Sequence, residues 1–239
     1  MTTASGPPVG AEARGLAFTR LVTFTDAVFA IAATLLFIDL MPPQTGSDVY
    51  ETALVDYLSQ PGPFLATTIG FVVVASYWTS HRRMFLLLAD ASPALVRMNL
   101  LLLFGVAMQP FLTAALAEHD PNRTSVTLYS VGQVGTSLAQ LGMWAAAIRT
   151  GCLAPAATPR RRTFVTLQLL RSPIVFAASV PITMTLGPGP GMLSWLTLVA
   201  LNVAINATYG EGSRPSPAAA ARRPGAAART NRAARRSGA

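Results

Sequence analysis

Two acidic residues lie inside an apolar stretch that runs from Arg20 to Leu40. About 20 apolar residues at about 1.5 Å each are enough for a helix to cross the hydrocarbon core of a bilayer. An ionisable side chain at that depth is costly unless it is paired or hydrated, and it commonly marks an ion or proton pathway. Asp26 and Asp39 are therefore the first candidates for functional residues.

Helical spacing separates these two acids. At about 100° per residue, Ile31, Leu35 and Ile38 form one narrow apolar stripe. Asp39 lies on the flank of this stripe, whereas Asp26 falls on roughly the opposite face, as a buried acid in need of partners. Such a stripe is typical of lipid contact or core packing, so on its own it does not identify a pore lining.

The same stretch resembles the signature of a known channel family. It reads Arg20, three further residues, and then Phe24, Thr25 and Asp26. The endosomal and lysosomal potassium channels known as transmembrane protein 175, and their bacterial members in particular, carry an Arg, three residues and Phe-Ser-Asp at the start of the first membrane helix. Thr25 replaces the serine and keeps its hydroxyl. The similarity covers roughly the first half of the chain, and continues at Tyr77, Trp78, His81, Arg82, Arg83 and Phe85 and from Asn99 to Leu116.

The resemblance implies a homotetramer that conducts potassium, with the first helix of each subunit lining a central pore. It implies selectivity at an apolar constriction, which here would consist of Ile31, Leu35 and Ile38. Apolar rings can gate by dewetting, and Asp39 near the external mouth would attract cations. The motif residues are expected at a helix junction rather than in the ion path.

The composition places the chain in the membrane. Of its 239 residues, 51% are hydrophobic and only 12% are charged, which is far too apolar for an ordinary soluble domain. The formal charge of +8 reflects arginines in loops and in the tail, a distribution that indicates membrane topology and no nucleic-acid partner. The single cysteine, Cys152, excludes an intrachain disulfide and argues against a cysteine-based zinc site. We expect no cofactor and no bound metal.

Hydropathy and proline positions predict an all-α polytopic membrane protein with six transmembrane helices per subunit. The expected spans are Arg20 to Leu40, Phe64 to Leu88, Pro93 to Ala117, Ser125 to Ile148, Thr163 to Leu186 and Met192 to Tyr209. In the fifth span, Thr163 to Arg171 is expected to be an interfacial turn or two, and Gly187 to Gly191 a tight turn before the sixth. The spans form a channel domain at 18–209, between an N-terminal cytoplasmic segment at 1–17 and an Arg-, Ala- and Pro-rich tail at 210–239 whose composition predicts disorder.

Two local features predict how the third and fourth spans pack. Gln109 and Pro110 should kink the third span, because proline cannot continue the hydrogen-bond ladder of a helix. The fourth span contains Gly132, Gly135 and Gly142, and small residues allow helices to approach closely in lipid.

The arginines test this layout by the positive-inside rule. One side of the membrane receives Arg14, Arg20, Arg82, Arg83, Arg97, Arg149, Arg160, Arg161, Arg162, Arg171 and the tail, and the other receives only Arg123. Both termini are therefore expected in the cytoplasm, in a multi-pass protein of the cell membrane.

This topology brings the motif of the first helix to the depth at which the second span ends and the third begins. We expect Arg20, Thr25 and Asp26 to latch the first helix to these neighbours. The expected partners are Trp78, His81, Arg97 and Asn99. A single histidine beside arginines is more often a structural hydrogen-bonding group than a pH sensor or metal ligand, and His119 lies on the other side of the membrane.

A proton-coupled secondary transporter, with Asp26 and Asp39 as relay carboxylates, is the alternative function. The chain shows no inverted repeat, and Gln109 with Pro110 offers a single candidate for a broken helix. We do not expect an enzyme or a catalytic residue, because HExxH, GxSxG and P-loop motifs are absent. Potassium ions and the lipid bilayer are the expected partners.

Overall fold

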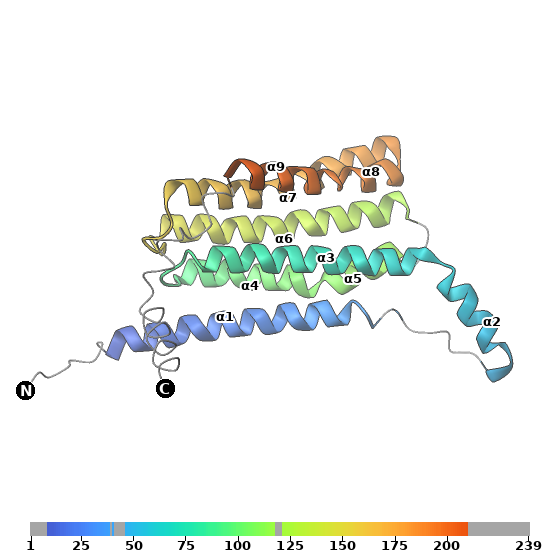
Figure 1. Cartoon of the computed structure of the whole chain (residues 1–239), viewed down its shortest axis with the longest axis horizontal. Coiled ribbons are helices and arrows are strands. Elements are labelled where there is room, and N and C mark those ends of the chain that lie inside the picture. The colour runs from blue at the N-terminus through green and yellow to red at the C-terminus, as the bar shows by residue number, and fades with distance from the viewer. Residues whose placement is uncertain (1–8, 39, 41–45, 118–120, 210–239) are drawn as a thin grey trace, which may run out of the picture.

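The computed structural model describes residues 9–38, 40, 46–117 and 121–209, and within these ranges all the regular elements are helices (Figure 1). They are α1 (Val9–Leu35), α2 (Ser47–Leu58), α3 (Pro61–Phe85), α4 (Pro93–Ala107), α5 (Gln109–Ala117), α6 (Arg123–Arg149), α7 (Pro159–Leu186), α8 (Pro188–Ser194) and α9 (Thr197–Tyr209). The expected all-α membrane fold is confirmed. The tail predicted at 210–239 lies outside the described residues.

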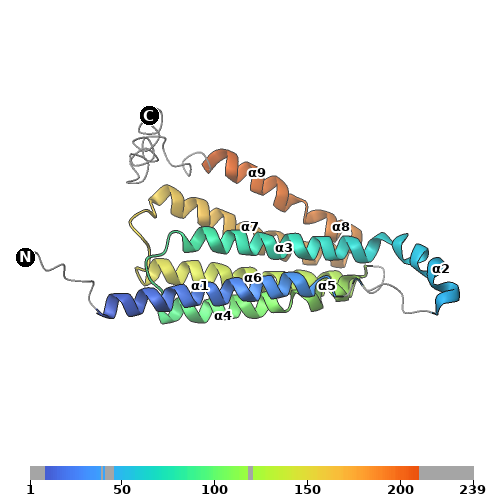
Figure 2. The same cartoon turned by 60° about the horizontal axis from the view of Figure 1, so that its bottom comes forward.

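The long helices lie side by side in a bundle, in which α4 with α5 and α8 with α9 each form one rod (Figures 1 and 2). Within the described part of the chain, five segments are long and apolar enough to cross a membrane: Glu12–Leu35, Pro61–Phe85, Pro93–Ala117, Pro159–Leu186 and Pro188–Tyr209. The remaining rod, α6, has 27 residues, but its buried face carries Gln133, Ser137 and Gln140, which lower its hydropathy. The crossing of the membrane by α6, and with it the count of six spans, stays a prediction.

Local sequence signals explain where several helices begin. Proline stands in the first turn of α3, α4, α7 and α8, where the amide proton it lacks has no partner inside the helix. Ser92 caps α4 by accepting a hydrogen bond from the Leu95 amide at 3.2 Å. Asn122 and Ser125 form a capping box at the start of α6. These signals fix the ends of the rods independently of their packing.

The stretch from Thr163 to Arg171, predicted to be an interfacial turn or two, is part of one continuous helix, and its position relative to the membrane surface stays a prediction. α7 is a single helix of 28 residues, and Arg171 lies inside it. The guanidinium is accommodated because it donates to backbone carbonyls, from Nε to Gln168 at 3.2 Å and from Nη1 to Leu198 of α9 at 3.5 Å. A charged side chain with such acceptors does not have to interrupt a helix.

Two helices also begin earlier than predicted. α8 begins at Pro188, so the chain reverses at Gly187 alone, where φ is 102°. A positive φ of this size favours glycine because other residues would strain their Cβ. At the other end, α1 begins at Val9, ahead of the boundary predicted at 18.

The third rod breaks at Met108, next to the predicted kink. α4 ends at Ala107 and α5 begins at Gln109. The Gln109 side chain compensates for the break, since its Nε2 donates to the carbonyl of Gly105 at 3.4 Å. The side chain of Gln109 therefore satisfies a carbonyl of α4 beside the break, although the amide proton that Pro110 lacks would have bonded the next carbonyl, that of Val106.

Close approach of α4 and α6 depends on particular glycines. A Cβ at Gly105 would collide with the side chain of Thr136, and one at Gly142 would lie 3.1 Å from the sulfur of Met98. Gly135, which the sequence grouped with the packing residues, has no heavy atom within 4 Å of such a Cβ. Glycine is thus needed for packing at some positions of the fourth span and not at others.

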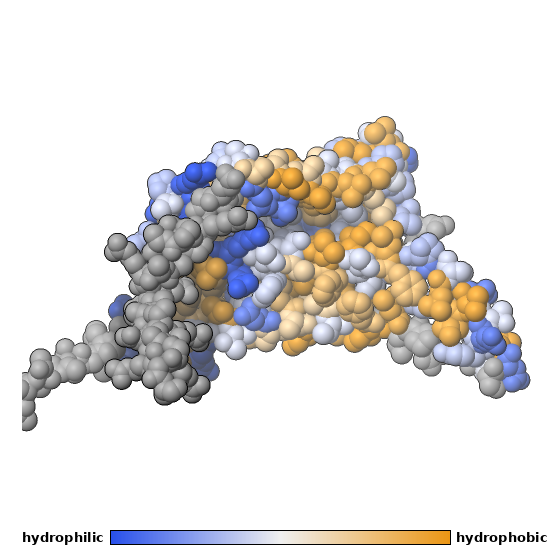
Figure 3. Space-filling view, in the orientation of Figure 1, coloured by the Kyte–Doolittle hydropathy of each residue, from blue (hydrophilic) through white to orange (hydrophobic). Residues whose placement is uncertain are grey.

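The core of the bundle has two parts. One contains Met84, Leu95, Leu102 and Trp144, and lies toward the ends of α3 and α6. The other is aromatic, with the Tyr129 and Trp195 rings 5.0 Å apart between centroids. On the outside, hydrophobic residues cover the middle of the bundle, and hydrophilic residues gather toward the end where α7 begins (Figure 3).

Candidate ion-pathway surface and helix junction

The predicted stripe of α1 is exposed in the subunit. Ile31 is 58% exposed, Leu35 39% and Ile38 58%, while Ala32 and Leu36 are buried against the bundle. Hydrogen bonds from Phe37 to Thr34 and from Ile38 to Leu35, both 3.1 Å, continue α1 as a tight turn that carries Ile38 on the same side. α1 therefore presents a continuous apolar surface that no described residue of the chain covers. Asp39, the predicted residue of the pore mouth, lies outside the described residues.

The structure joins three of the predicted junction residues in a buried chain of hydrogen bonds. Nδ2 of Asn99 on α4 donates to Oγ1 of Thr25 on α1 at 2.9 Å, and Oδ1 of Asn99 lies 3.0 Å from Nε2 of His81 on α3. Thr25 and Asn99 are 0% exposed. Because the amide nitrogen of Asn99 faces Thr25, its oxygen faces His81 and assigns the imidazole proton to Nε2. One side-chain amide thus links three helices.

Aromatic rings hold the His81 imidazole in place. It stacks on Phe85 with centroids 4.1 Å apart, and Phe29 of α1 lies 5.8 Å away at a tilt. Across the described residues, no group of three His, Cys, Asp or Glu side chains could hold a metal ion. The environment of His81 is that of a structural hydrogen-bonding group.

Asp26 has a partner, but it is not buried as the sequence suggested. Its Oδ1 accepts a hydrogen bond from Nε1 of Trp78 at 2.9 Å, and the Asp26 side chain is exposed in the subunit. The buried polar residue of the motif is Thr25, one position earlier. The guanidinium of Arg82 lies 5.8 Å from the centre of the Trp78 ring. The indole therefore contacts the carboxylate of Asp26 through its N–H group and the cation of Arg82 through its ring face.

The remaining predicted junction residues stand outside this set of contacts. Phe24 is 53% exposed, and Arg20 and Arg97 are exposed as well. Among the described residues, neither arginine has a hydrogen bond or ion pair with the junction. The structure therefore brings together Thr25, Asp26, Trp78, His81 and Asn99, and it leaves Arg20, Phe24 and Arg97 on the surface.

A second polar network, which the sequence did not reveal, lies deeper in the bundle. The Tyr77 hydroxyl lies 2.6 Å from Oγ of Ser137, which donates to Ser172 of α7 at 2.9 Å. Gln133 of α6 donates to Oε1 of Gln109 at 2.8 Å. The polar positions of α6 recur at 133, 137 and 140, about one turn apart, and this spacing was the available signal.

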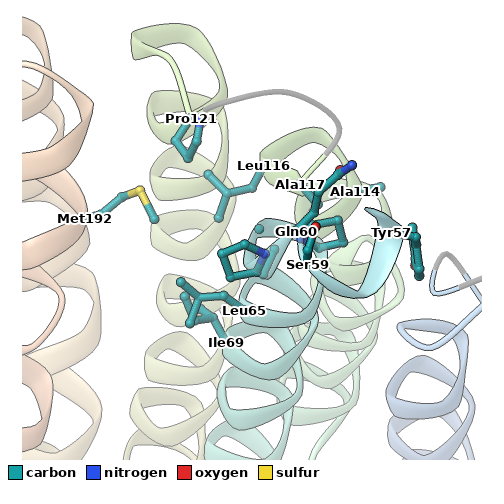
Figure 4. A pocket seen from close by; sticks show the side chains of 14 residues that line it. Tyr57, Ser59, Gln60, Leu65, Ile69, Ala114, Leu116, Ala117, Pro121 and Met192 are labelled. Atoms are coloured by element: carbon teal, nitrogen blue, oxygen red, sulfur yellow. The ribbon is translucent and has the colours of Figure 1, made fainter. Parts of the chain in front are cut away.

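A cavity of ≈ 840 Å³ lies at the opposite end of the bundle, beside the corner between α2 and α3. In Figure 4, Met192 of α8 points toward Leu116 and Pro121 across this cavity. None of the predicted site residues lines it. The cavity and the helix junction are therefore separate features.

Comparison with known proteins identifies the family. The family model described as endosomal/lysosomal potassium channel TMEM175 matches residues 20–110. A potassium channel of Streptomyces collinus is 34% identical over 156 residues, which cover 61% of this chain and 74% of the relative. A potassium channel of Chamaesiphon minutus is 38% identical over 116 residues, covering 46% of this chain and 56% of that protein.

The fold agrees with this match. The crystal structure of a lysosomal potassium-selective channel TMEM175 homolog from Chamaesiphon minutus aligns with a TM-score of 0.65 and 26% identity, over 79% of this chain and 98% of that one. The human endosomal/lysosomal proton channel TMEM175 is 33% identical over 143 residues, and this chain spans 28% of its length. The relatives are ion channels and not enzymes. The chain is a multi-pass membrane protein that belongs to the TMEM175 family.

Proposed function

We propose that the chain is a potassium-permeable cation channel of the cell membrane, with α1 from each subunit lining the pore. The observation that carries this proposal is the exposure of Ile31, Leu35 and Ile38 along one side of α1, opposite the face that packs on the bundle. One helix cannot enclose a path, so several copies must place this side around a common axis. The relatives named as potassium channels support potassium as the ion.

The stripe acts as the constriction. Rings of Ile and Leu side chains narrow the pore and exclude water until they separate, so they control conduction without a charged filter. Leu35 closes the last turn of α1, one turn beyond Ile31, and Ile38 follows in the tight turn. Asp39, which follows Ile38 in the sequence, would attract cations at the external mouth.

The junction positions the pore helix. Thr25 and Asp26 tie α1 to α4 and α3 at the cytoplasmic end, through Asn99 and Trp78. Movement of α3 or α4 is thereby transmitted to α1, while the constriction itself lies one to three turns further along the helix. The assembly is a homotetramer with both termini in the cytoplasm.

A flux assay tests the proposal. Purified protein in liposomes with a potassium gradient, a proton ionophore and a pH dye should show potassium flux that falls when sodium replaces potassium. Ile31→Asn places a polar group in the constriction and should raise flux and reduce the preference for potassium. Ile174→Asn is the matched control, since Ile174 on α7 is 61% exposed and lies outside α1.

The outcomes separate the candidate functions. Ile31→Asn currents identical to wild type, from folded protein, would remove this ring from the pathway. Flux that appears only with an imposed proton gradient would favour the transporter that uses Asp26 and Asp39.

Native mass spectrometry of the same sample should show about four times the subunit mass of 25.1 kDa.

A further inference from the structure

A second cavity, of ≈ 570 Å³, forms a groove between α3, α7 and the α8–α9 rod. Figure 2 shows α9 diverging from α7 toward the end where the described chain stops. The walls are apolar and include Leu65 and Val72 of α3 and Leu193, Leu196 and Val199 of α8 and α9. A volume in the range of about 300–1000 Å³, with apolar walls and a few polar groups, is typical of a site for a small amphipathic molecule.

Three buried side chains on the groove have polar atoms without partners. Both amide atoms of Gln168 have no hydrogen-bond partner, although the residue is only 6% exposed. Nε1 of Trp195, which is 8% exposed, and the hydroxyl of Tyr129, which is 0% exposed, have none either. All three residues line the groove. Buried donors and acceptors are normally hydrogen-bonded, and Gln168, three residues before Arg171, presents one of each to a ligand in the groove.

The groove also carries a cationic side chain. Arg171 lines the groove and donates only to the backbone carbonyls of Gln168 and Leu198. No carboxylate among the described residues pairs with it. Side chains of a helix lean toward its N-terminus, so Arg171, about three turns into α7, directs its charge toward the end of the bundle at which α7 begins. Guanidinium groups recognise phosphate through paired hydrogen bonds.

We propose that this groove binds an anionic membrane phospholipid. The phosphate pairs with Arg171, the polar groups of the glycerol region reach Gln168, and one acyl chain lies against the apolar walls of α3 and α8–α9. Charge complementarity favours an anionic lipid over a second copy of the chain, because Arg171 gives the groove a cationic group and no carboxylate of the described residues lines it.

Native mass spectrometry tests the charge requirement. The full chain is purified, stripped of lipid, and titrated with phosphatidylglycerol or with phosphatidylcholine that carries the same acyl chains. Phosphatidylglycerol should bind more tightly, and Arg171→Gln should weaken its binding about tenfold and reduce the difference in affinity between the two lipids. Arg160→Gln, an exposed arginine in the first turn of α7, is the matched control and should leave both affinities unchanged.

A second pair of variants tests the shape of the groove. Val199 and Val203 lie on α9 and are both 63% exposed, but only Val199 lines the groove. Val199→Trp should block lipid binding, and Val203→Trp should not. Normal phosphatidylglycerol binding by Val199→Trp would overturn the proposal. So would a change in assembly mass without loss of lipid, because the groove would then be an interface between subunits.

Gln168→Leu is a variant that should change the polar end of the groove without unfolding the protein, so that a loss of lipid binding can be told apart from misfolding. It removes an unpaired amide from a buried position, so the lipid-free protein should melt at the same or a higher temperature. The rise in melting temperature on addition of phosphatidylglycerol should become smaller than in wild type. A full lipid-induced rise in both Gln168→Leu and Arg171→Gln would contradict the assignment of the polar end of the groove.

Discussion

The side chains of Thr25 and Asn99, 74 positions apart, meet in a hydrogen bond of 2.9 Å that fixes α1 on α4. The side-chain amide of Asn99 is also hydrogen-bonded to His81 of α3, so this one residue sets the position of α1, the proposed pore helix, relative to both α3 and α4. Thr25 retains the hydroxyl of the serine in the family signature, and this hydroxyl accepts the bond. The additional methyl group of threonine is accommodated in a fully buried position.

Asn99→Leu should destabilise the subunit. The replacement leaves the Thr25 hydroxyl and the His81 imidazole buried without their partner, and each such group costs about 1–3 kcal/mol. Thermal unfolding in detergent measures the effect. Asn206→Leu is the control, because Asn206 bonds only within α9, to Asn202, and its loss should change the midpoint much less.

Trp78 and Asp26 should be energetically coupled. Trp78→Phe removes the indole donor, whereas Asp26→Ala removes the acceptor, and the double mutant should lose less stability than the sum of the two singles. The expected coupling is about 0.5–1.5 kcal/mol. Asp26→Asn keeps an oxygen acceptor and removes the charge, so it separates hydrogen bonding from electrostatics. If Asp26→Asn and Asp26→Ala both left folding, assembly and current unchanged, the latch would have no function.

Gly105→Ala should destabilise the contact between α4 and α6. The added methyl group collides with Thr136, and overpacking of this kind costs about 1–3 kcal/mol. Gly135→Ala is a matched change on α6, where the new methyl group meets nothing within 4 Å. It should be neutral or stabilising, because alanine has the higher helix propensity. Equal melting temperatures for the two variants would show that the close approach is not specific.

Gln109 and Gln133 should behave as a pair. Either single change to leucine breaks the bond from Nε2 of Gln133 to Oε1 of Gln109 and leaves one buried atom of the other amide without its partner, at about 1–3 kcal/mol. The double replacement removes both amides and should recover much of that loss. Unfolding of the four proteins under the same conditions gives the comparison, and additive losses would mean that the two side chains do not act together.

The sequence predicted those parts of the structure that depend on local pattern. Hydropathy located the long helices, proline marked where they begin, and Gln109 with Pro110 indicated the break next to Met108. The spacing of Ile31, Leu35 and Ile38 predicted a shared side of α1, since helical periodicity determines which residues lie together.

Features that depend on a distant partner could not be predicted in this way. Arg171 lies within α7 and donates to a carbonyl on α9, 27 residues later in the chain, a contact that no local pattern indicates. Asp26 is exposed in the subunit although its neighbour Thr25 is buried, a difference that depends on how α1 rotates against α3 and α4. The network around Tyr77 and Gln133 required the register between α3 and α6.

The limited burial of α1 has a thermodynamic consequence. Only 17% of its most apolar window is buried within the subunit, against 39% for the rod formed by α4 and α5. In the proposed assembly, neighbouring copies would cover the exposed side of α1 and add to the free energy that holds it in place. Mass action links the two processes, so dilution of the purified protein should loosen α1 before the rest of the bundle unfolds. Hydrogen exchange of α1 should therefore depend on protein concentration, while exchange in α6 should not.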